Sequence, residues 1–150
     1  PLVVRLAGTK FKEGKKMDEL QIWTLFSSNR IGSALTGIGI ILAIWLSLRI
    51  AKATRESDEA NLFTKAVSSL FGLITLAYAW QQYTIGGNIR VAAAQSLSNL
   101  KESGTELSQV AEGFISNVGT DFSATPSPLG IAFLVVIAIM ILVQIWLPKN

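Results

Sequence analysis

Three uninterrupted apolar blocks dominate the pattern of hydrophobic and polar positions along the chain. They cover Ile31–Leu48, Ala66–Ile85 and Leu129–Leu147, and each has 18 to 20 residues without Asp, Glu, Lys or Arg. At a rise of about 1.5 Å per residue, a helix of this length crosses the roughly 30 Å of hydrocarbon in a bilayer. The pattern therefore predicts an all-α integral membrane protein with three transmembrane helices.

The stretch before the first block predicts a separate helix in the plane of the membrane. Asp18 is a suitable N-cap, and Trp23 and Phe26 favour the bilayer interface. We expect this N-terminal interfacial helix to end in a break at Ser27–Asn29, so that Ser28 or Asn29 caps the first span. The predicted parts are a basic tail and interfacial helix at 1–30, transmembrane helices at 31–50, 62–85 and 128–147, a polar loop at 51–61, an extramembrane segment at 86–127 and a tail at 148–150.

Capping signals and helix breakers predict the remaining boundaries. Ser57 or Asp58 can begin the second transmembrane helix, and Gly86–Gly87 can stop it. Pro128 suits the first turn of the last helix. Ser103 and Glu106 match an S-x-x-E capping box, which favours two extramembrane helices that meet near Ser103.

The extramembrane segment carries an amphipathic stripe. Apolar or small residues recur there at alternating steps of four and three residues, which places them on one helical face. About forty residues are too few to enclose a core, so we expect the membrane surface or another subunit to cover the stripe. Its partner-facing members are Leu97, Leu100, Leu107, Phe114 and Val118.

Small residues line one face of each of the first two spans. On the first span they are Gly32, Thr36, Gly39, Ala43 and Ser47, and on the second Ser68, Gly72, Thr75 and Ala79. Helices in a bilayer associate through close backbone approach over such faces. We predict a tight antiparallel hairpin with the third span packed more loosely. The same faces could meet a neighbouring subunit, or could reflect only the abundance of glycine in transmembrane helices.

Aromatic residues near the ends of the apolar blocks are candidate interface anchors. They are Trp23, Tyr78, Trp80, Tyr83 and Trp146. Basic residues are nearly balanced between the two sides of the membrane, so the positive-inside rule selects neither orientation.

Composition argues against chemistry carried by this chain. It has no cysteine and no histidine, which removes disulfides, thiolate nucleophiles and imidazole ligands, and the ten acidic residues lie outside the apolar blocks. No nucleophile elbow, phosphate loop or dinucleotide fingerprint occurs. We therefore expect no enzyme activity, no metal and no cofactor of its own, although bound lipids are expected. Nucleic acid is not an expected partner, because anionic headgroups lie nearer to the basic tail.

The remaining hypotheses concern assembly. We favour a non-catalytic accessory subunit of a larger respiratory, photosynthetic or membrane monooxygenase complex, with membrane lipids and other integral membrane subunits as partners. The alternative is a homo-oligomeric pore or a holin-like protein, although holins typically end in a highly charged tail and this chain ends in Lys149–Asn150. The expected location is a bacterial or archaeal inner membrane or an organelle membrane.

Overall fold

Four helices make up the part of the protein that the structure, a computed structural model, describes, which is residues 17–148. They are α1 (Glu19–Glu56), α2 (Leu62–Glu102), α3 (Gln109–Val118) and α4 (Pro128–Trp146). The predicted basic tail before Met17 and the last two residues lie outside the described residues. Three of the helices, α1, α2 and α4, are long and apolar enough to cross a membrane, which confirms the all-α fold and indicates a multi-pass membrane protein.

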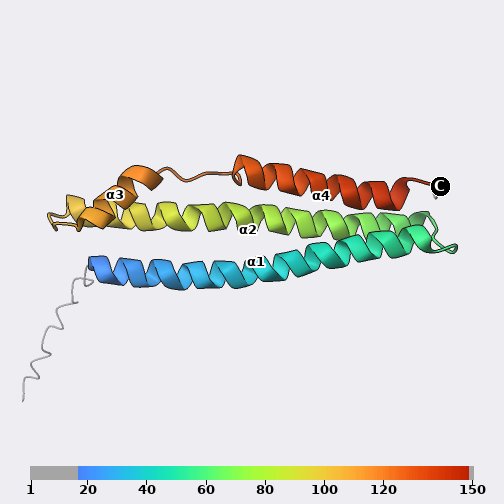
Figure 1. Ribbon diagram of the computed structural model, residues 1–150, viewed down its shortest axis with the longest axis horizontal. Coiled ribbons are helices and arrows are strands. Elements are labelled where there is room, and N and C mark those ends of the chain that lie inside the picture. The colour runs from blue at the N-terminus through green and yellow to red at the C-terminus, as the bar shows by residue number, and fades with distance from the viewer. Residues whose placement is uncertain (1–16, 149–150) are drawn as a thin grey trace, which may run out of the picture.

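The helices α1 and α2 form a long antiparallel hairpin, and α4 runs alongside it (Figure 1). The short helix α3 packs against the end of α2 that lies far from the hairpin loop. At about 1.5 Å per residue, the 19 residues of α4 span roughly 28 Å, close to the thickness of the hydrocarbon layer. The 38 residues of α1 and 41 residues of α2 span about 57 and 61 Å, so the hairpin is much longer than a bilayer is thick.

The predicted start of α1 is confirmed, but the predicted break within it is wrong. The Asp18 carboxylate accepts a hydrogen bond from the Gln21 backbone N–H at 2.8 Å, and Asp18 N–H donates to the Gln21 side chain at 3.2 Å. The helix then runs through Ser27–Asn29 without interruption, so no separate in-plane helix exists and neither Ser28 nor Asn29 is a cap. Polar residues cost a helix only a few tenths of a kcal/mol each, and the packing of Ile22 outweighs that cost.

The helix α2 starts later and ends later than its sequence signals predict. Its N-cap is Asn61, whose side chain accepts from the Thr64 N–H at 2.9 Å, rather than Ser57 or Asp58. Gly86–Gly87 does not stop it. Two glycines cost a helix about 2 kcal/mol, but Gly86 faces Ser33 of α1, where an added Cβ would lie 3.2 Å from the Ser33 hydroxyl oxygen. The missing side chain therefore allows α1 and α2 to lie close together.

A helix end near Ser103 is confirmed, whereas the capping box there is not formed. Ser103 is the C-cap of α2, and Gly104 follows with φ of 89°, a conformation that favours glycine. The next helix begins five residues later than predicted, with Ser108 as the N-cap of α3, and Glu106 is exposed in the connection. Pro128 lies in the first turn of α4, as predicted.

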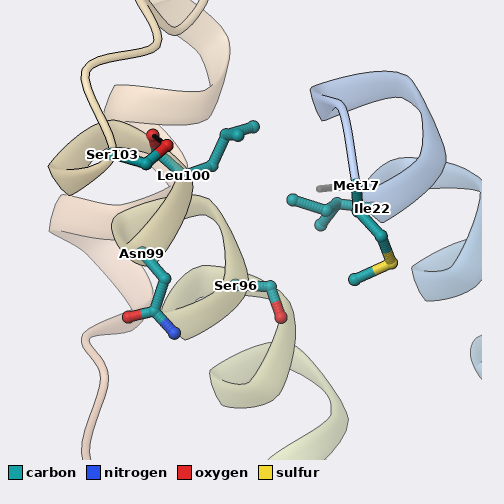
Figure 2. Close-up of a pocket in the computed structure, with 6 residues that line it drawn as sticks. All are labelled: Met17, Ile22, Ser96, Asn99, Leu100 and Ser103. Carbon is teal, nitrogen blue, oxygen red and sulfur yellow. Dashed lines mark hydrogen bonds between the residues drawn. The ribbon is translucent and has the colours of Figure 1, made fainter. Parts of the chain in front are cut away.

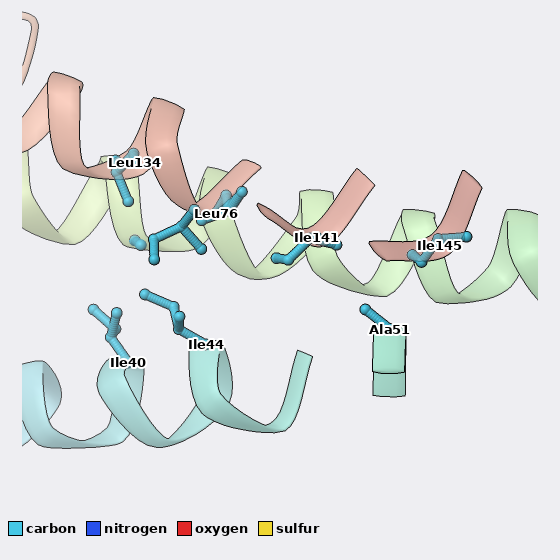
Figure 3. Packing of buried hydrophobic residues seen from close by; sticks show 9 residues of the cluster. Ile40, Ile44, Ala51, Leu76, Leu134, Ile141 and Ile145 are labelled. Carbon is cyan, nitrogen blue, oxygen red and sulfur yellow. The ribbon is translucent and has the colours of Figure 1, made fainter. Parts of the chain in front are cut away.

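Two separate clusters of buried residues hold the helices together. We call the part of the hairpin that lies beside α4 the membrane section (residues 31–56, 62–89 and α4). We call the remainder the head (residues 17–30, 90–102 and α3). In the membrane section, Ile40 and Ile44 of α1 point toward α2 (Figure 3). Residues of α4 continue the cluster along the helices, from Leu134 to Ile145, which lies near Ala51 (Figure 3). In the head, Ile22, Leu97, Leu100 and Ala111 are buried together.

Candidate helix-packing surfaces

The small-residue face of α1 has two halves with different surroundings. Ser47 and Ala51 are buried against α2, with exposed fractions of 1% and 0%. Gly32 and Gly39 are exposed, and an added Cβ at either position would meet nothing within 4 Å. Only the half nearer the hairpin loop is therefore used for packing within the described part of the chain.

Hydroxyl groups join α1 to α2 in the buried half. The Ser47 hydroxyl donates to the Thr75 hydroxyl at 3.3 Å and to its own helix at Ala43 O at 2.8 Å. The hydroxyls of Thr54 and Ser68 lie 2.7 Å apart, again between α1 and α2. Such interhelical bonds are each worth about 0.6 kcal/mol in a membrane protein, so they contribute mainly to register and less to the overall stability.

The small face of α2 is shared between α1 and α4. A Cβ on Gly72 would lie 2.8 Å from Cγ2 of Ile141, so the absence of a side chain is what admits α4. At the C-terminal end of α4, five residues beyond Ile141, the indole N–H of Trp146 donates to the Ser69 hydroxyl at 3.0 Å. The prediction that the third span packs more loosely than the hairpin does not hold at this position, because α4 lies directly on Gly72. Ala79 is fully buried and belongs to the same cluster.

The open half of the α1 face borders a groove between α1 and α2. Its lining from α1 includes Thr36, Gly39 and Ala43, and its lining from α2 is Ile74, Thr75 and Tyr78. The groove encloses about 470 Å³. The Thr36 hydroxyl donates to Gly32 O of its own helix at 3.1 Å, so it presents no free donor to the groove. The groove is therefore mostly apolar, which suits contact with another helix or with lipid.

The amphipathic stripe is covered by the chain itself. Leu97 and Leu100 are buried at 0% and 8% exposure, facing Ile22 of α1 and Ala111 of α3. Leu107 and Phe114 pack on the same cluster, and Val118 is half-buried at the end of α3. The expectation that these leucines face a partner is therefore wrong. The first turns of α1, which were predicted to form a helix in the membrane plane, pack against them.

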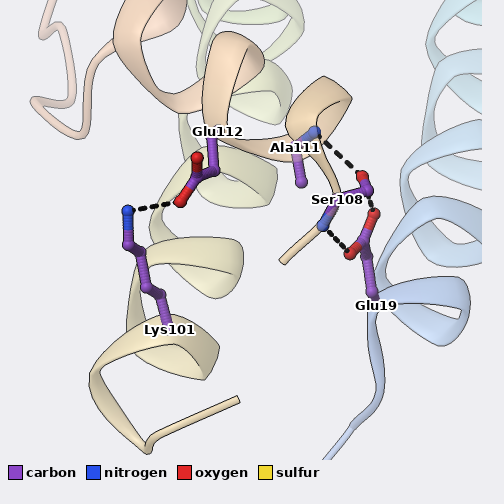
Figure 4. A network of polar contacts seen from close by, with 5 residues as sticks. All are labelled: Glu19, Lys101, Ser108, Ala111 and Glu112. Carbon is purple, nitrogen blue, oxygen red and sulfur yellow. Dashed lines mark hydrogen bonds and ion pairs between the residues drawn. The ribbon is translucent and has the colours of Figure 1, made fainter. Parts of the chain in front are cut away.

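Aromatic rings and one carboxylate fasten α3 to α1. The ring centroid of Phe114 lies 5.1 Å from that of Trp23 and 5.6 Å from that of Phe26, both edge-on. Glu19 accepts hydrogen bonds from the Ser108 hydroxyl at 2.6 Å and the Ser108 backbone N–H at 2.9 Å (Figure 4). These two bonds, with a third from the Trp23 indole, lower the pKa of the Glu19 carboxyl. Trp23, predicted as an interface anchor, therefore packs within the head and is not part of the membrane section.

The other predicted anchors lie along α2 and at the end of α4. Tyr83 contacts Phe133 at the start of α4, with ring centroids 6.5 Å apart. Trp146 marks the opposite end of α4, where Lys65 lies 5.9 Å from its ring. Tyr78 and Trp80 are exposed at 51% and 37%, and their role as interface anchors stays a prediction.

Sequence reasoning missed two features of these surfaces. Ser33 and Gly86 form a close approach between α1 and α2, and the i, i+4 spacing of Ser33 and Gly37 was the signal that could have revealed it. The Gln144 side-chain oxygen of α4 is buried without a hydrogen-bond partner in the part of the chain described.

Within 17–148, no three His, Cys, Asp or Glu side chains are grouped so that they could hold a metal ion. The head contains a cavity of about 280 Å³ between α1 and α2, where Ile22 and Leu100 point toward one another beside Ser96 and Asn99 (Figure 2). Its lining has no ionisable side chain.

No protein-family model, no curated protein sequence and no solved structure matches this chain.

Proposed function

We propose that this protein is a non-catalytic accessory subunit of a larger membrane complex, of respiratory, photosynthetic or membrane monooxygenase type. One observation carries the proposal: the groove beside Thr36, Gly39 and Ala43 lies on a helix hairpin apolar enough to cross a membrane, and a Cβ on Gly39 would meet nothing there within 4 Å. Small residues favour close approach of a second helix, and here no helix of residues 17–148 fills the space. A transmembrane helix of another subunit is the occupant that fits this surface.

The long hairpin supports the same proposal. Beyond α4, both α1 and α2 continue as helices for more than three turns, and α3 braces them. A head held by leucines and aromatic rings is a rigid projection that can contact the extramembrane domains of neighbouring subunits. The role proposed is therefore to position neighbouring subunits through helix packing in the membrane and through the head outside it.

The test compares two substitutions on the surface of α1. Gly39→Leu fills the groove without meeting any atom of its own chain within 4 Å of the new Cβ, so the isolated subunit should fold normally. Ile38→Leu changes a neighbouring, 57% exposed residue outside the groove and is the matched control. After mild-detergent extraction, native electrophoresis should show the wild type and the control in a larger complex with different proteins, and the Gly39 variant dissociated from it.

Two results would contradict the proposal. One is migration of the wild type solely as a homo-oligomer, which would favour the alternative of a homo-oligomeric pore. That alternative also predicts release of dye from liposomes by the purified protein. The other is an unchanged complex in the Gly39→Leu variant, which would remove the groove from the assembly interface.

A further inference from the structure

A large cavity lies where α1, α2 and the start of α4 meet. It encloses about 720 Å³, a size typical of small-ligand sites. Arg30 and Arg90 line one part of it, and Ile40, Leu129 and Phe133 line another. A site with cationic and apolar parts has the chemistry of an amphipathic anion, with a charged head and a hydrocarbon tail.

The depth of the cavity matches the boundary between lipid tails and headgroups. A Cβ on Gly130 of α4 would lie 3.8 Å from Tyr83 of α2, so the first turn of α4 is level with Tyr83. Arg90 lies seven residues beyond Tyr83 on α2, or about 10 Å along the helix axis. Pro128 begins α4 and marks the edge of the hydrocarbon layer. Arg90 therefore lies roughly 7 Å farther from the membrane centre than Pro128, within a headgroup layer that is about 5–8 Å thick.

Arg30 is at the same level as Arg90. Gly86 of α2 faces Ser33 of α1, and the two helices are antiparallel. Arg30 precedes Ser33 by three residues and Arg90 follows Gly86 by four, so both lie about one turn farther out. Two guanidinium groups on neighbouring helices can then approach one phosphate from two sides.

Side-chain contacts distinguish these two arginines from the other basic residues in the described part of the chain. Arg49 lies 5.2 Å from the ring of Trp45, and Lys65 lies 5.9 Å from that of Trp146. The other partnered cations are Lys52 with Glu56, Arg55 with Pro148 O, and Lys101 with Glu112. Among the basic side chains of residues 17–148, only those of Arg30 and Arg90 have no ion pair, hydrogen bond or ring contact.

No carboxylate lies close along either helix to compensate them. The nearest acidic residue on α1 is Glu19 and on α2 is Glu102, each about 16–18 Å away along the axis. No acidic residue lines the cavity. Uncompensated arginines beside a hydrophobic cleft attract an anion strongly, because the low-dielectric wall reduces screening.

Glycines keep the apolar part of the cavity open. Gly37 and Gly87 line it, and a Cβ at either position would meet nothing within 4 Å. The cleft can therefore receive a chain that lies along α1 toward Ile40, past Leu129 and Phe133 of α4. Ser127 and Gln82 also line it and supply hydrogen-bonding groups at the level of the glycerol esters.

We propose that this cavity is a binding site for one anionic phospholipid of the leaflet nearest the head. Its phosphate is held between Arg30 and Arg90, and one acyl chain lies against Ile40, Leu129 and Phe133. The lipid fills the space between the start of α4 and the hairpin, and so joins three helices at the membrane boundary. This site does not depend on the accessory-subunit proposal, since a bilayer supplies the ligand to the isolated chain.

The test measures lipid retained by the purified full chain. The protein is reconstituted into vesicles of equal parts phosphatidylcholine and phosphatidylglycerol, extracted in mild detergent and weighed with its bound lipid by native mass spectrometry. The wild type should retain phosphatidylglycerol in preference to phosphatidylcholine. Arg30→Gln or Arg90→Gln should each lower that retention about fivefold, and both together roughly twentyfold.

Further variants separate the headgroup from the tail and from folding. Gly37→Leu should block both lipids while both arginines remain. Arg49→Gln with Lys52→Gln, which removes two partnered cations at the other end of the membrane section, should leave retention unchanged, and Arg30→Lys with Arg90→Lys should restore most of it. Circular dichroism of each variant confirms that it is folded.

Three outcomes would overturn the proposal. The first is equal retention of the two lipids by the wild type. The second is unchanged retention in the folded Arg30→Gln, Arg90→Gln double variant. The third is displacement of phosphatidylglycerol by millimolar inorganic phosphate, which would identify the site as one for a free anion.

Discussion

The membrane section and the head are held together by opposite kinds of side chain. In the membrane section, α1 and α4 approach α2 over Ser47, Gly72 and other small residues, and hydroxyl pairs link the helices. In the head, leucines, a tryptophan and phenylalanines fill the space between α1, α2 and α3. Burial of large apolar side chains is the arrangement that water favours, whereas close backbone approach is the usual means of helix association in a bilayer, where lipid tails are as apolar as the side chains.

This difference predicts different responses to the same kind of substitution. Added volume should be harmful where backbones are close, and removed volume should be harmful where large side chains are buried. The predictions below are ordered from the largest expected effect to the smallest.

Gly72→Leu should be the most destabilising change. Its Cβ alone would lie 2.8 Å from Ile141, so α4 must move away from α2. Overpacking of this kind costs about 1–3 kcal/mol, and a rigid isoleucine in a buried row places it at the upper end. Unfolding in mild detergent should report this loss of free energy, and Gly39→Leu, which adds the same volume in open space, is the control. Equal stability of the two variants would refute close packing of α4 on Gly72.

Phe114→Ala should loosen the head and leave the membrane section intact. The ring makes edge-on contacts with both Trp23 and Phe26, each worth about 0.5–1.5 kcal/mol beyond its burial. We expect a loss of about 2 kcal/mol in the docking of α3, seen as faster hydrogen exchange in Gln109–Val118. Val110→Ala, at a residue that is 74% exposed, should change exchange little. Faster exchange in α4 as well would show that the two sections are one cooperative unit.

Thr54→Val should have a smaller effect. It keeps the shape of the side chain and removes the hydroxyl that pairs with Ser68 at 2.7 Å. The expected cost is about 0.6 kcal/mol, with about 1.7 kcal/mol as the upper end for such bonds. Thr36→Val removes a hydroxyl that bonds only within α1 and is the matched control. The interhelical bond contributes nothing if both variants unfold at the same detergent or denaturant concentration.

Glu19→Gln should abolish a weak pH dependence of the head. Hydrogen bonds from Ser108 and Trp23 lower the pKa of Glu19 below its ordinary value of 4.5 in the folded protein. The bonds to the carboxylate therefore stabilise the head above pH 4.5, and this contribution is lost as the pH falls through the lowered pKa. The protection factor of the α3 amides, which is the intrinsic exchange rate divided by the observed rate at the same pH, should fall at low pH in the wild type and depend less on pH in the variant. An identical pH profile for both would exclude Glu19 as the titrating group.

Local sequence signals predicted some parts of the fold and failed at others for a common reason. Asp18 and Pro128 act through neighbours within a few residues, so their roles at helix starts were readable. Ser27–Asn29 and Gly86–Gly87 are weak helix formers, but the long-range packing of Ile22, Leu97 and Ser33 outweighs their local cost. Each failure thus occurred where a contact between distant residues opposed a local preference.

The candidate surfaces show the same limit. Helical spacing correctly placed Gly32, Thr36, Gly39, Ala43 and Ser47 along α1, but spacing contains no information on which part of the row another helix covers. The cavity between Arg30 and Arg90 gave no local signal, because it forms only where three segments distant in sequence converge.

The sequence by itself determined that this is an all-helical chain with three helices apolar enough to cross a membrane, because length and hydropathy are properties of each segment alone. Only the tertiary structure decided that α1 and α2 continue well beyond the third span, that α4 lies on Gly72, and that half of the small face of α1 stays open. These outcomes depend on which helix packs against a given surface. That is set by contacts between residues distant in sequence, which exist only in the assembled fold.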